Sequence, residues 1–400
     1  MDYKVDKAEV KIAQSEALAK LSKTKPTILI GAGGTAGHVN PALAIARALM
    51  KINPDFQIVF CGNGGEIEAS LVNKSEFDFY WMEAWGLNHK TLAGYFETSL
   101  VNFRGFRQAR ALLKKLNVVA CIGAGGYVSF PLLLAARRKK IKYFLHEQNA
   151  IPGRATKVFS PKANVVFTSY SETEELLPKS KKVVFSGNPV NEDFFQQDKT
   201  EARKKLQISD DEFYILVTGG SLGAKNLNET CVKLAVSLEN KSNELEKKVR
   251  IHLISGKDRY DEIKQDALAQ GSALEVSDYS YNMPEEMAAA DLVISRAGAG
   301  TCAELQALGA PSILVPYPYA INNHQEYNAR VLVDNGAAFK LDDLSLNVEE
   351  LENIILDVMN NPEKLVKMSE KAKEYSPKNA AKIVATNIFE EIKKIKIMNR

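Results

Sequence analysis

Glycine-rich segments that each follow a short apolar run and precede a helical pattern are the strongest chemical signal in the chain. The first is GAGGTAGH, which ends at His38, and the others are GAGGY, TGGSLG and RAGAG. Glycine permits backbone conformations with positive φ and lets a ligand approach the main chain closely. A helix start adds free N–H groups and a partial positive charge, which suits phosphate. Together the segments predict a phosphate-containing ligand, although any one of them alone could equally be a tight strand-to-helix turn.

The loops do not match the two common nucleotide-binding patterns. GAGGTAG fits the dinucleotide fingerprint only loosely, and no acidic residue stands cleanly at the end of the next strand, where the sequence CGNGGEIE is itself glycine-rich. No GK[ST] sequence follows any of the loops, which argues against a P-loop. Hydride transfer and ATP hydrolysis are therefore both disfavoured.

Three side chains in or beside these loops could act on such a ligand. His38, with an ordinary imidazole pKa of about 6.5, could be a general base near neutral pH or could fix its loop through a backbone hydrogen bond. Ser221 could offer its hydroxyl to a diphosphate, or it could cap the helix that follows. Glu304, one turn into the helix after RAGAG, could accept hydrogen bonds from both hydroxyls of a ribose. It could instead be a first-turn acid that complements the helix dipole.

The elements that position these loops alternate between apolar runs of strand length and helical patterns, which indicates a parallel α/β architecture. TILI and its glycine loop lead into NPALAIARALMK, a helix that Asn40 could cap, and the same plan restarts at FYILVTGG. We therefore predict two doubly wound, Rossmann-like domains. Ligands in such sheets bind beyond the carboxyl ends of the strands, so the crevice between the domains is the expected site.

The domain boundaries follow from where these patterns start and stop. We expect a charged, solvated extension at 1–25, one domain at 26–190 and a second at 191–375. The last segment, 376–400, is expected to be a helix that returns to the first domain.

Size and composition agree with two domains and disfavour several classes of protein. The chain has 400 residues, 45% hydrophobic and 25% charged, and its net charge of +3 is too small to argue for nucleic acid. No run of about 18 apolar residues occurs, so no segment is expected to span a membrane. Cys61, Cys121, Cys231 and Cys302 lie far apart, which fits a reducing compartment, and we expect no bound metal.

The motifs, taken together and in order, resemble one known family. GGTAGHVNPALAIA, GAGGYVSFP, HEQNAIPG, SGNPV, TGGSLGA and RAGAGTCAEL followed by NHQEYNA are similar to the motifs of the MurG family, the N-acetylglucosaminyltransferases that make lipid II for peptidoglycan. The resemblance covers about residues 26–390. It implies a GT-B fold and an inverting transfer of GlcNAc from UDP-GlcNAc to the C4 hydroxyl of MurNAc in undecaprenyl-diphospho-MurNAc-pentapeptide (lipid I). It implies no cofactor.

The resemblance also implies roles for particular residues. His38 matches the proposed base of the family, and Glu304 matches the residue that holds the ribose. Gln325 matches a glutamine that reads the GlcNAc hydroxyls, while His324 stands where some relatives have another glutamine. The other positions that match the donor site are Thr35, Ala36, Gly37, Asn149, Ser221, Ser280, Ala299, Gly300 and Thr301.

One position departs from the family pattern. Asn191 follows GNPV, where the family often has an arginine that contacts the donor phosphates. Asparagine can donate a hydrogen bond to a phosphate but cannot neutralise it, so either another cation compensates or donor binding is weaker. Arg296 and Lys225 are the candidate cations.

The segment AWGLNHKTLAGYFETSLVNFRGFRQARALLKK combines large apolar side chains with basic ones. Apolar anchors with a basic fringe suit binding to an anionic membrane surface. The alternative is a core-facing helix with a solvated basic face, but the family has a hydrophobic, basic-rimmed patch in this region. We therefore expect a peripheral protein on the cytoplasmic face of the plasma membrane. The expected membrane patch consists of Leu92, Tyr95, Phe96, Leu100, Phe103, Arg104 and Arg107.

Two other interpretations stay open at this point. The chain could be another UDP-sugar enzyme of the GT-B fold, such as a glycolipid glycosyltransferase or a UDP-GlcNAc 2-epimerase. It could also be a non-catalytic nucleotide-sugar-binding protein, for which Asn191 is the only sequence support. The expected partners are UDP-GlcNAc, lipid I, an anionic membrane surface and other proteins of cell-wall synthesis, with no nucleic acid.

Overall fold

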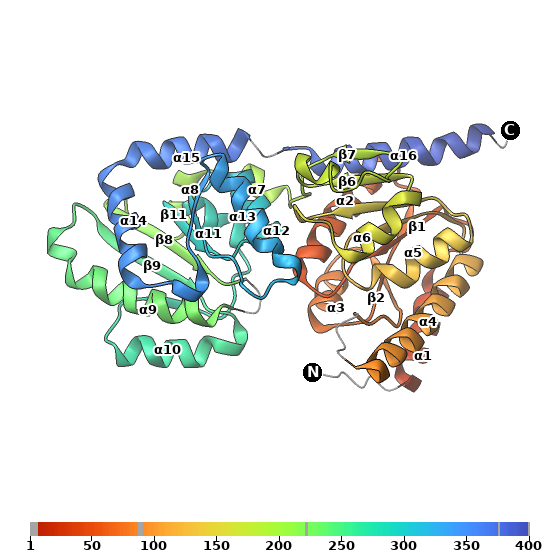
Figure 1. The fold of residues 1–400 in the computed structure, drawn as a ribbon, viewed down its shortest axis with the longest axis horizontal. Helices are drawn as coiled ribbons and strands as arrows, with labels where there is room; N and C mark the ends of the chain where they lie inside the picture. Colours follow the sequence, from red (N-terminus) through yellow and green to blue (C-terminus); the bar gives the residue numbers. More distant parts are fainter. Residues whose placement is uncertain (1–6, 87–90, 221–222, 375–376, 399–400) are drawn as a thin grey trace. The chain divides into compact units, whose positions relative to one another are not determined.

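The computed structural model describes residues 7–86, 91–220, 223–374 and 377–398. The chain divides into two compact units, and each is built on its own parallel β-sheet (Figure 1). The first unit comprises Met1–Pro189 and Asn379–Arg400, and the second comprises Val190–Lys378.

The sheet of the first unit has seven strands in the order β3-β2-β1-β4-β5-β6-β7. Every neighbouring pair is parallel, and the register pairs Ile28 with Ile58 and Ile30 with Phe60. Strands buried on both faces need nearly continuous apolar sequence, which is why TILI and IVF stand out in the chain. The strand order reverses between β1 and β4, and this is the position where doubly wound sheets bind ligands. The strands are β1 (Thr27–Gly31), β2 (Gln57–Gly62), β3 (Asp78–Trp81), β4 (Val118–Gly123), β5 (Tyr143–Glu147), β6 (Val165–Thr168) and β7 (Val183–Phe185).

Helices cover both faces of this sheet. On one face, Val384 and Ile388 of the last helix join a buried apolar cluster with Ile45. On the other face, Ala109 and Leu132 belong to a second cluster. The helices of this unit are α1 (Lys7–Lys20), α2 (Ala36–Ile52), α3 (Glu66–Asn73), α4 (Leu92–Lys115), α5 (Ser129–Arg138), α6 (Arg154–Phe159) and α16 (Ala380–Met398), with short 3₁₀ helices η1 (Ser160–Lys162) and η2 (Ser171–Glu174).

The first and the last helix both pack against other elements of the first unit. Helix α16 runs alongside α2 (Figure 1), and Lys142 Nζ lies 3.1 Å from Glu391 Oε2. Helix α1 contacts β3, where Gln14 Nε2 donates a hydrogen bond of 2.8 Å to the carbonyl of Trp81. The extension that we expected to be solvated therefore has a packed helix.

The sheet of the second unit repeats the plan with six strands in the order β10-β9-β8-β11-β12-β13. Its order reverses between β8 and β11, so this unit has its own switch point. Alternate residues of β8 face opposite sides, because Ile215 and Val217 belong to one apolar cluster and Leu216 belongs to the other. The strands are β8 (Glu212–Thr218), β9 (Lys248–Ile254), β10 (Glu275–Ser277), β11 (Leu292–Ser295), β12 (Ser312–Leu314) and β13 (Ala338–Lys340).

The helices of the second unit connect these strands and cover both faces of the sheet. They are α7 (Asp193–Gln196), α8 (Lys199–Lys205), α9 (Lys225–Asn240), α10 (Tyr260–Ala269), α11 (Met283–Ala289), α12 (Ala299–Leu308), α13 (His324–Asp334), α14 (Val348–Asn360) and α15 (Pro362–Glu374). Short 3₁₀ helices are η3 (Ser242–Glu244), η4 (Lys257–Arg259), η5 (Ile321–Asn323) and η6 (Asp343–Ser345).

Candidate active site

The first glycine loop lies at the carboxyl end of β1, beside the reversal of strand order. Helix α2 begins at Ala36, ahead of Asn40, the residue that the sequence suggested as its cap. Thr35 is the N-cap residue, and its carbonyl accepts hydrogen bonds from the N–H groups of His38 (3.1 Å) and Val39 (3.3 Å). His38 is therefore a residue of the first helical turn rather than of the loop. Thr35, Ala36 and Gly37 form the start of this helix, so its free N–H groups also lie at the carboxyl end of β1.

The imidazole of His38 has a defined orientation. Its Nδ1 lies 3.1 Å from the carbonyl oxygen of Gly33 and 3.2 Å from the hydroxyl of Thr35. A carbonyl oxygen can only accept, so Nδ1 is the protonated nitrogen in that contact and Nε2 carries the lone pair. A Cβ atom on Gly125 would come within 2.9 Å of His38 Nε2, so the loop after β4 lies directly against the ring. With the proton on Nδ1 and the lone pair on Nε2, His38 has the tautomer that a general base acting through Nε2 needs.

Side chains tie the neighbouring loops of the first unit together. Ser129 Oγ lies 2.8 Å from the carbonyl oxygens of both Gly31 and Gly125, which joins the loops after β1 and β4. Asn63 Nδ2 donates a hydrogen bond of 2.9 Å to the hydroxyl of Tyr127, which joins the loops after β2 and β4. These contacts hold the backbone around His38 in place.

Asn149 is held by an acid that sequence reasoning missed. Glu147 ends β5, is only 4% exposed, and accepts hydrogen bonds from the N–H of Asn149 (3.2 Å) and of Gly153 (2.9 Å). The hydroxyl of Thr156 donates to the same carboxylate. An acid at the end of an otherwise apolar strand was the available signal, because a buried carboxylate must be hydrogen-bonded.

In the second unit, the predicted ribose residue lies on α12. Ala299, Gly300 and Thr301 form the first turn of this helix, and Glu304 is half-buried on the next turn. Burial raises the pKa of the Glu304 carboxyl to about 7. Its charge therefore changes near neutral pH, which makes its role as an acceptor pH-dependent.

Gln325 lies in the first turn of α13 and has one end of its amide already engaged. Its Oε1 accepts a hydrogen bond of 2.9 Å from the N–H of Tyr317, which orients the NH₂ group as the remaining donor. His324 Nδ1 lies 2.7 Å from the carbonyl oxygen of Ile321, to which it donates. Asn328 Nδ2 donates a hydrogen bond of 3.2 Å to the carbonyl of Ala297, which links α13 to the loop before α12.

Ser280 lies in the loop after β10, and hydrogen bonds fix the orientation of its side chain. Its hydroxyl donates a hydrogen bond of 2.8 Å to Glu286 Oε1 and accepts one of 3.1 Å from the N–H of Asn282. Glu286 Oε2 lies 3.0 Å from Nδ1 of the buried His252. Ser221, the expected diphosphate contact, lies outside the described residues.

The structure separates the two cations that could compensate for Asn191. Arg296 is only 8% exposed, and its Nη1 lies 2.7 Å from Asp343 Oδ1, so its charge is neutralised inside the second unit. Lys225 is the first residue of α9, and its exposed side chain lies 3.6 Å from Glu229. Asn191 itself donates a hydrogen bond of 2.8 Å to Asp193 Oδ2 at the start of α7. Of the two, Lys225 is therefore the more exposed cation.

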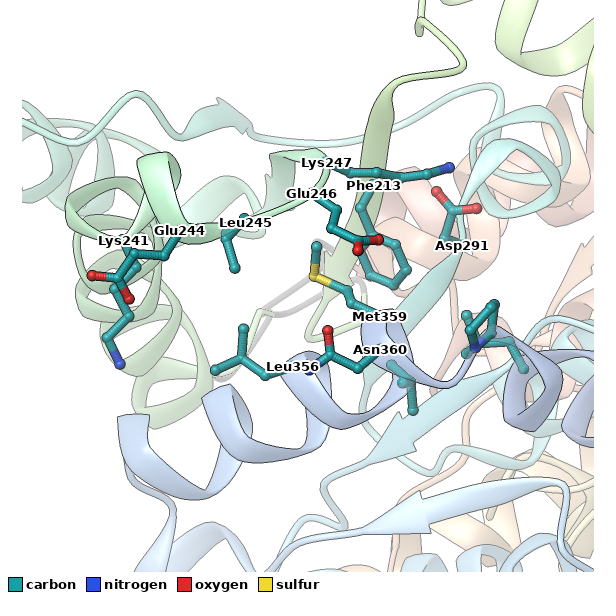
Figure 2. Close-up of a pocket in the computed structure, with 13 residues that line it drawn as sticks. Phe213, Lys241, Glu244, Leu245, Glu246, Lys247, Asp291, Leu356, Met359 and Asn360 are labelled. Atoms are coloured by element: carbon teal, nitrogen blue, oxygen red, sulfur yellow. The ribbon is translucent and has the colours of Figure 1, made fainter.

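A pocket of about 530 Å³ lies at the amino ends of the strands of the second sheet, opposite the ends that the glycine loops follow (Figure 2). Its lining includes Phe213 near the start of β8, Lys247 just before β9 and Asp291 just before β11. It contains none of the residues that the sequence analysis singled out. Doubly wound sheets bind ligands at their carboxyl edge, so we do not assign the active site to this pocket.

Helix α4 places the expected membrane patch on its outward face. Leu92, Phe96 and Phe103 are 90%, 68% and 57% exposed, and Tyr95 and Leu100 are exposed beside them. The core-facing side of the helix has mainly small residues instead, among them Gly94, Thr98, Gly105 and Ala109. The large apolar side chains of Leu92, Phe96 and Phe103 therefore do not pack into the core, whereas Leu112 and Leu113 near the end of the helix do.

Arg104 and Arg107 are the basic members of this face. Both are exposed, and Arg104 Nε lies 2.6 Å from Glu83 Oε2. Among the described residues, no helix is long and apolar enough to cross a membrane. The described residues also include no group of three or more His, Cys, Asp or Glu side chains that could hold a metal ion.

Two Rossmann-like units with glycine loops at the carboxyl ends of their strands have the architecture of the GT-B fold, which nucleotide-sugar glycosyltransferases share. The model of the glycosyltransferase family 28 N-terminal domain matches residues 28–168, and that of the C-terminal domain matches residues 214–384. The chain belongs to glycosyltransferase family 28 and, within it, to the MurG family of N-acetylglucosaminyltransferases. The resemblance and the fold inferred from the sequence motifs are thus confirmed.

Similarity to these relatives extends over nearly the whole chain. The UDP-N-acetylglucosamine–N-acetylmuramyl-(pentapeptide) pyrophosphoryl-undecaprenol N-acetylglucosamine transferase of Caldanaerobacter subterraneus is 38% identical, covering 88% of this chain and 96% of the relative. The enzyme of the same name from Acetivibrio thermocellus is 38% identical, covering 92% and 98%. The crystal structure of Acinetobacter baumannii MurG has a TM-score of 0.71 and 28% identity, covering 92% of this chain and 100% of that one. A UDP-GlcNAc 2-epimerase from Neisseria meningitidis, at 16% identity and a TM-score of 0.64, shares the fold alone.

Proposed function

We propose that this protein transfers GlcNAc from UDP-GlcNAc to the C4 hydroxyl of MurNAc in lipid I, with inversion at the anomeric carbon, and thereby forms lipid II. Membership of the MurG family supports the reaction. The observation in the chain itself that supports it best is the Nδ1 contact of His38 to the carbonyl of Gly33, which leaves Nε2 as the basic nitrogen.

The proposed reaction is a single displacement. The C4 oxygen of MurNAc attacks the anomeric carbon of GlcNAc from the face opposite UDP, and the bond to the diphosphate breaks. His38 Nε2 takes the proton of the attacking hydroxyl, a contribution that is typically about 10²–10⁴-fold in rate. Negative charge grows on the departing diphosphate. Backbone N–H groups at helix starts such as Ala36–Gly37 are oriented before the reaction and stabilise that charge.

We assign donor binding mainly to the second unit. The carboxylate of Glu304 accepts hydrogen bonds from the ribose hydroxyls, and the first turn of α12, Ala299 to Thr301, lies beside the nucleotide. The backbone near Ser280 contacts the uracil, and the NH₂ of Gln325 donates to a GlcNAc hydroxyl. The remaining donor contacts are proposed for Thr35, Asn149, Asn191 and Ser221.

We assign membrane attachment to the exposed face of α4. The acceptor has a long lipid chain, so the enzyme must work at a membrane surface. Leu92, Phe96 and Phe103 would enter the lipid headgroup region, and Arg107 would lie over anionic headgroups. This supports a peripheral position on the cytoplasmic face of the plasma membrane.

The experiment that tests the proposed function is an assay with UDP-GlcNAc and a short-chain analogue of lipid I. We expect the lipid II analogue and UDP in equal amounts, and unchanged rates when divalent ions are chelated. UDP-ManNAc as the product would indicate an epimerase. Binding of UDP-GlcNAc without turnover at any acceptor concentration would indicate a non-catalytic nucleotide-sugar-binding protein.

A further inference from the structure

A buried carboxyl group lies directly behind the first glycine loop. Glu68 on α3 is only 2% exposed, and both of its carboxyl oxygens are buried without a hydrogen bond of standard geometry. A Cβ atom on Gly33 or on Gly62 would collide with this carboxyl group. Because Gly33 has no side chain, the carboxyl group of Glu68 fits beside it. This role of the loop glycine is separate from allowing a ligand to approach the backbone.

One peptide group lies between this carboxyl and His38. The backbone N–H of Gly34 faces the Glu68 carboxyl. The carbonyl of Gly33 belongs to the same peptide group and accepts the hydrogen bond from His38 Nδ1 at 3.1 Å. In a planar trans peptide the N–H and C=O bonds point in opposite directions, and a charge at one end polarises the group toward the other. Gly34 has φ +87°, a conformation that glycine adopts readily.

We propose that Glu68 is a positioning residue of the transferase: its ionised carboxylate acts through the Gly33–Gly34 peptide to hold His38 in the Nδ1–H tautomer, with Nε2 as the base. This inference rests on the proposed role of His38 in the reaction. Glu68 itself touches no reacting atom. Negative charge at the N–H end of the peptide makes the carbonyl of Gly33 a stronger acceptor, and the stronger acceptor favours a proton on Nδ1.

The charge of Glu68 can change near neutral pH. Burial raises its pKa to about 7, and the N–H groups of Gly34, Gly64 and Asn63 act in the opposite direction. The other titratable group that faces it is the buried thiol of Cys61 on β2, whose own pKa is raised by burial and then by Glu68.

No basic side chain in the described part of the chain forms an ion pair with Glu68. The packed helix α2 carries the basic side chains of Arg47 and Lys51, and Arg47 Nε is paired with Glu76 Oε1 at 3.0 Å. The Nδ1–H tautomer of His38 should therefore be favoured above about pH 7 and lose this support as pH falls and Glu68 is protonated.

The test is nitrogen NMR of the histidine side chains at pH 8.5, where neutral tautomers are distinguished by their ring nitrogen shifts. The chain has five histidines, and a His38→Asn variant identifies the resonance of interest. We expect the Nδ1–H tautomer to predominate in the wild-type protein and the Nε2–H tautomer to gain several-fold in Glu68→Gln. Glu76→Gln, a surface change on the same unit, should leave the ratio unchanged. Equal tautomer ratios in wild-type protein and Glu68→Gln would overturn the inference.

A second measurement covers the case in which Glu68→Gln does not fold. With glutamate labelled at its side-chain carboxyl carbon, the Glu68 resonance in wild-type protein should titrate near pH 7, and the His38 ring nitrogens should show an inflection at the same pH. His38 shifts that follow only their own protonation would refute the coupling. Neither measurement needs a substrate, so a failure of the lipid I assay and a failure of this inference remain distinguishable.

The kinetic counterpart is a split between kcat and KM. Glu68→Gln should lower kcat at pH 8 by about tenfold, a part of what a general base contributes, with KM for UDP-GlcNAc nearly unchanged. A purely structural role would change both constants, or would lower the melting temperature without changing the tautomer ratio.

Discussion

His38 Nδ1 and the carbonyl oxygen of Gly33 lie 3.1 Å apart, although the two residues belong to different elements, one to a helix and the other to the loop before it. The contact exists because α2 starts at Ala36, so that its first turn folds the imidazole back over its own loop. A start at Asn40 would leave His38 in the loop without this constraint. The early helix start therefore gives the proposed base its orientation.

Replacing His38 by alanine should lower kcat by about 10²–10⁴-fold while the affinity for UDP-GlcNAc changes little, because a base acts on the acceptor hydroxyl. Steady-state kinetics with a lipid I analogue and donor titration by calorimetry would measure the two effects. His324→Ala is the matched control, since its Nδ1 only donates to the carbonyl of Ile321 near the start of α13. Turnover like that of the wild type in His38→Ala would remove this residue from the mechanism.

Replacing Lys225 by alanine should weaken UDP-GlcNAc binding by about tenfold, the effect of losing one favourable contact of about 1.4 kcal/mol between an exposed lysine and a phosphate. Asn191→Arg should tighten binding in turn, because it adds the charge that the family usually has at this position. Lys247→Ala, at the opposite edge of the second sheet, is the control. If neither Lys225→Ala nor Asn191→Arg changed the affinity for UDP-GlcNAc, the result would show that neither residue contacts the diphosphate.

The sequence was sufficient to predict the alternation of strands and helices, the two doubly wound domains and the glycine loops, because parallel strands and strand-to-helix turns leave local signatures. Contacts between residues far apart in the chain were not predictable in the same way. Glu68 lies behind Gly33 only because β1 and β2 are neighbours, and Glu147 accepts its hydrogen bonds only because the following loop folds back on it.

The cation that could compensate for Asn191 could not be chosen from the sequence either, because the choice depends on contacts between residues far apart in the chain. Arg296 and Lys225 had equal standing in the sequence, and only the contact between Arg296 and Asp343 separates them. The start of α2 was misjudged for a different reason: Asn40 is a favourable N-cap residue by type, but Thr35 occupies the N-cap position and Asn40 lies inside the helix.

Donor affinity should depend on pH through Glu304, whose pKa burial raises to about 7. The ionised carboxylate accepts hydrogen bonds from the ribose, so binding is strongest above about pH 7 and weakens as pH falls and the carboxyl is protonated. Calorimetric titration with UDP-GlcNAc from pH 6 to pH 8 would measure the change, because this phosphodiester has no group of its own that titrates in that interval. In Glu304→Gln the dependence should disappear and affinity should stay low throughout. A pH dependence that survives in Glu304→Gln would belong to another group.

Membrane binding should depend on the exposed face of α4. Changing Leu92, Phe96 and Phe103 to serine should reduce binding to vesicles that contain anionic lipid by at least about tenfold, since each large apolar side chain that leaves an apolar environment costs about 1.5–3 kcal/mol. The melting temperature should stay within a few degrees, because all three side chains are exposed in the folded protein. Leu268→Ser, at a leucine in the second unit that is 71% exposed, is the control for a general loss of surface hydrophobicity. Vesicle binding that persists in the triple variant and is abolished by salt alone would place the attachment on the basic residues, and the apolar face would then have another role.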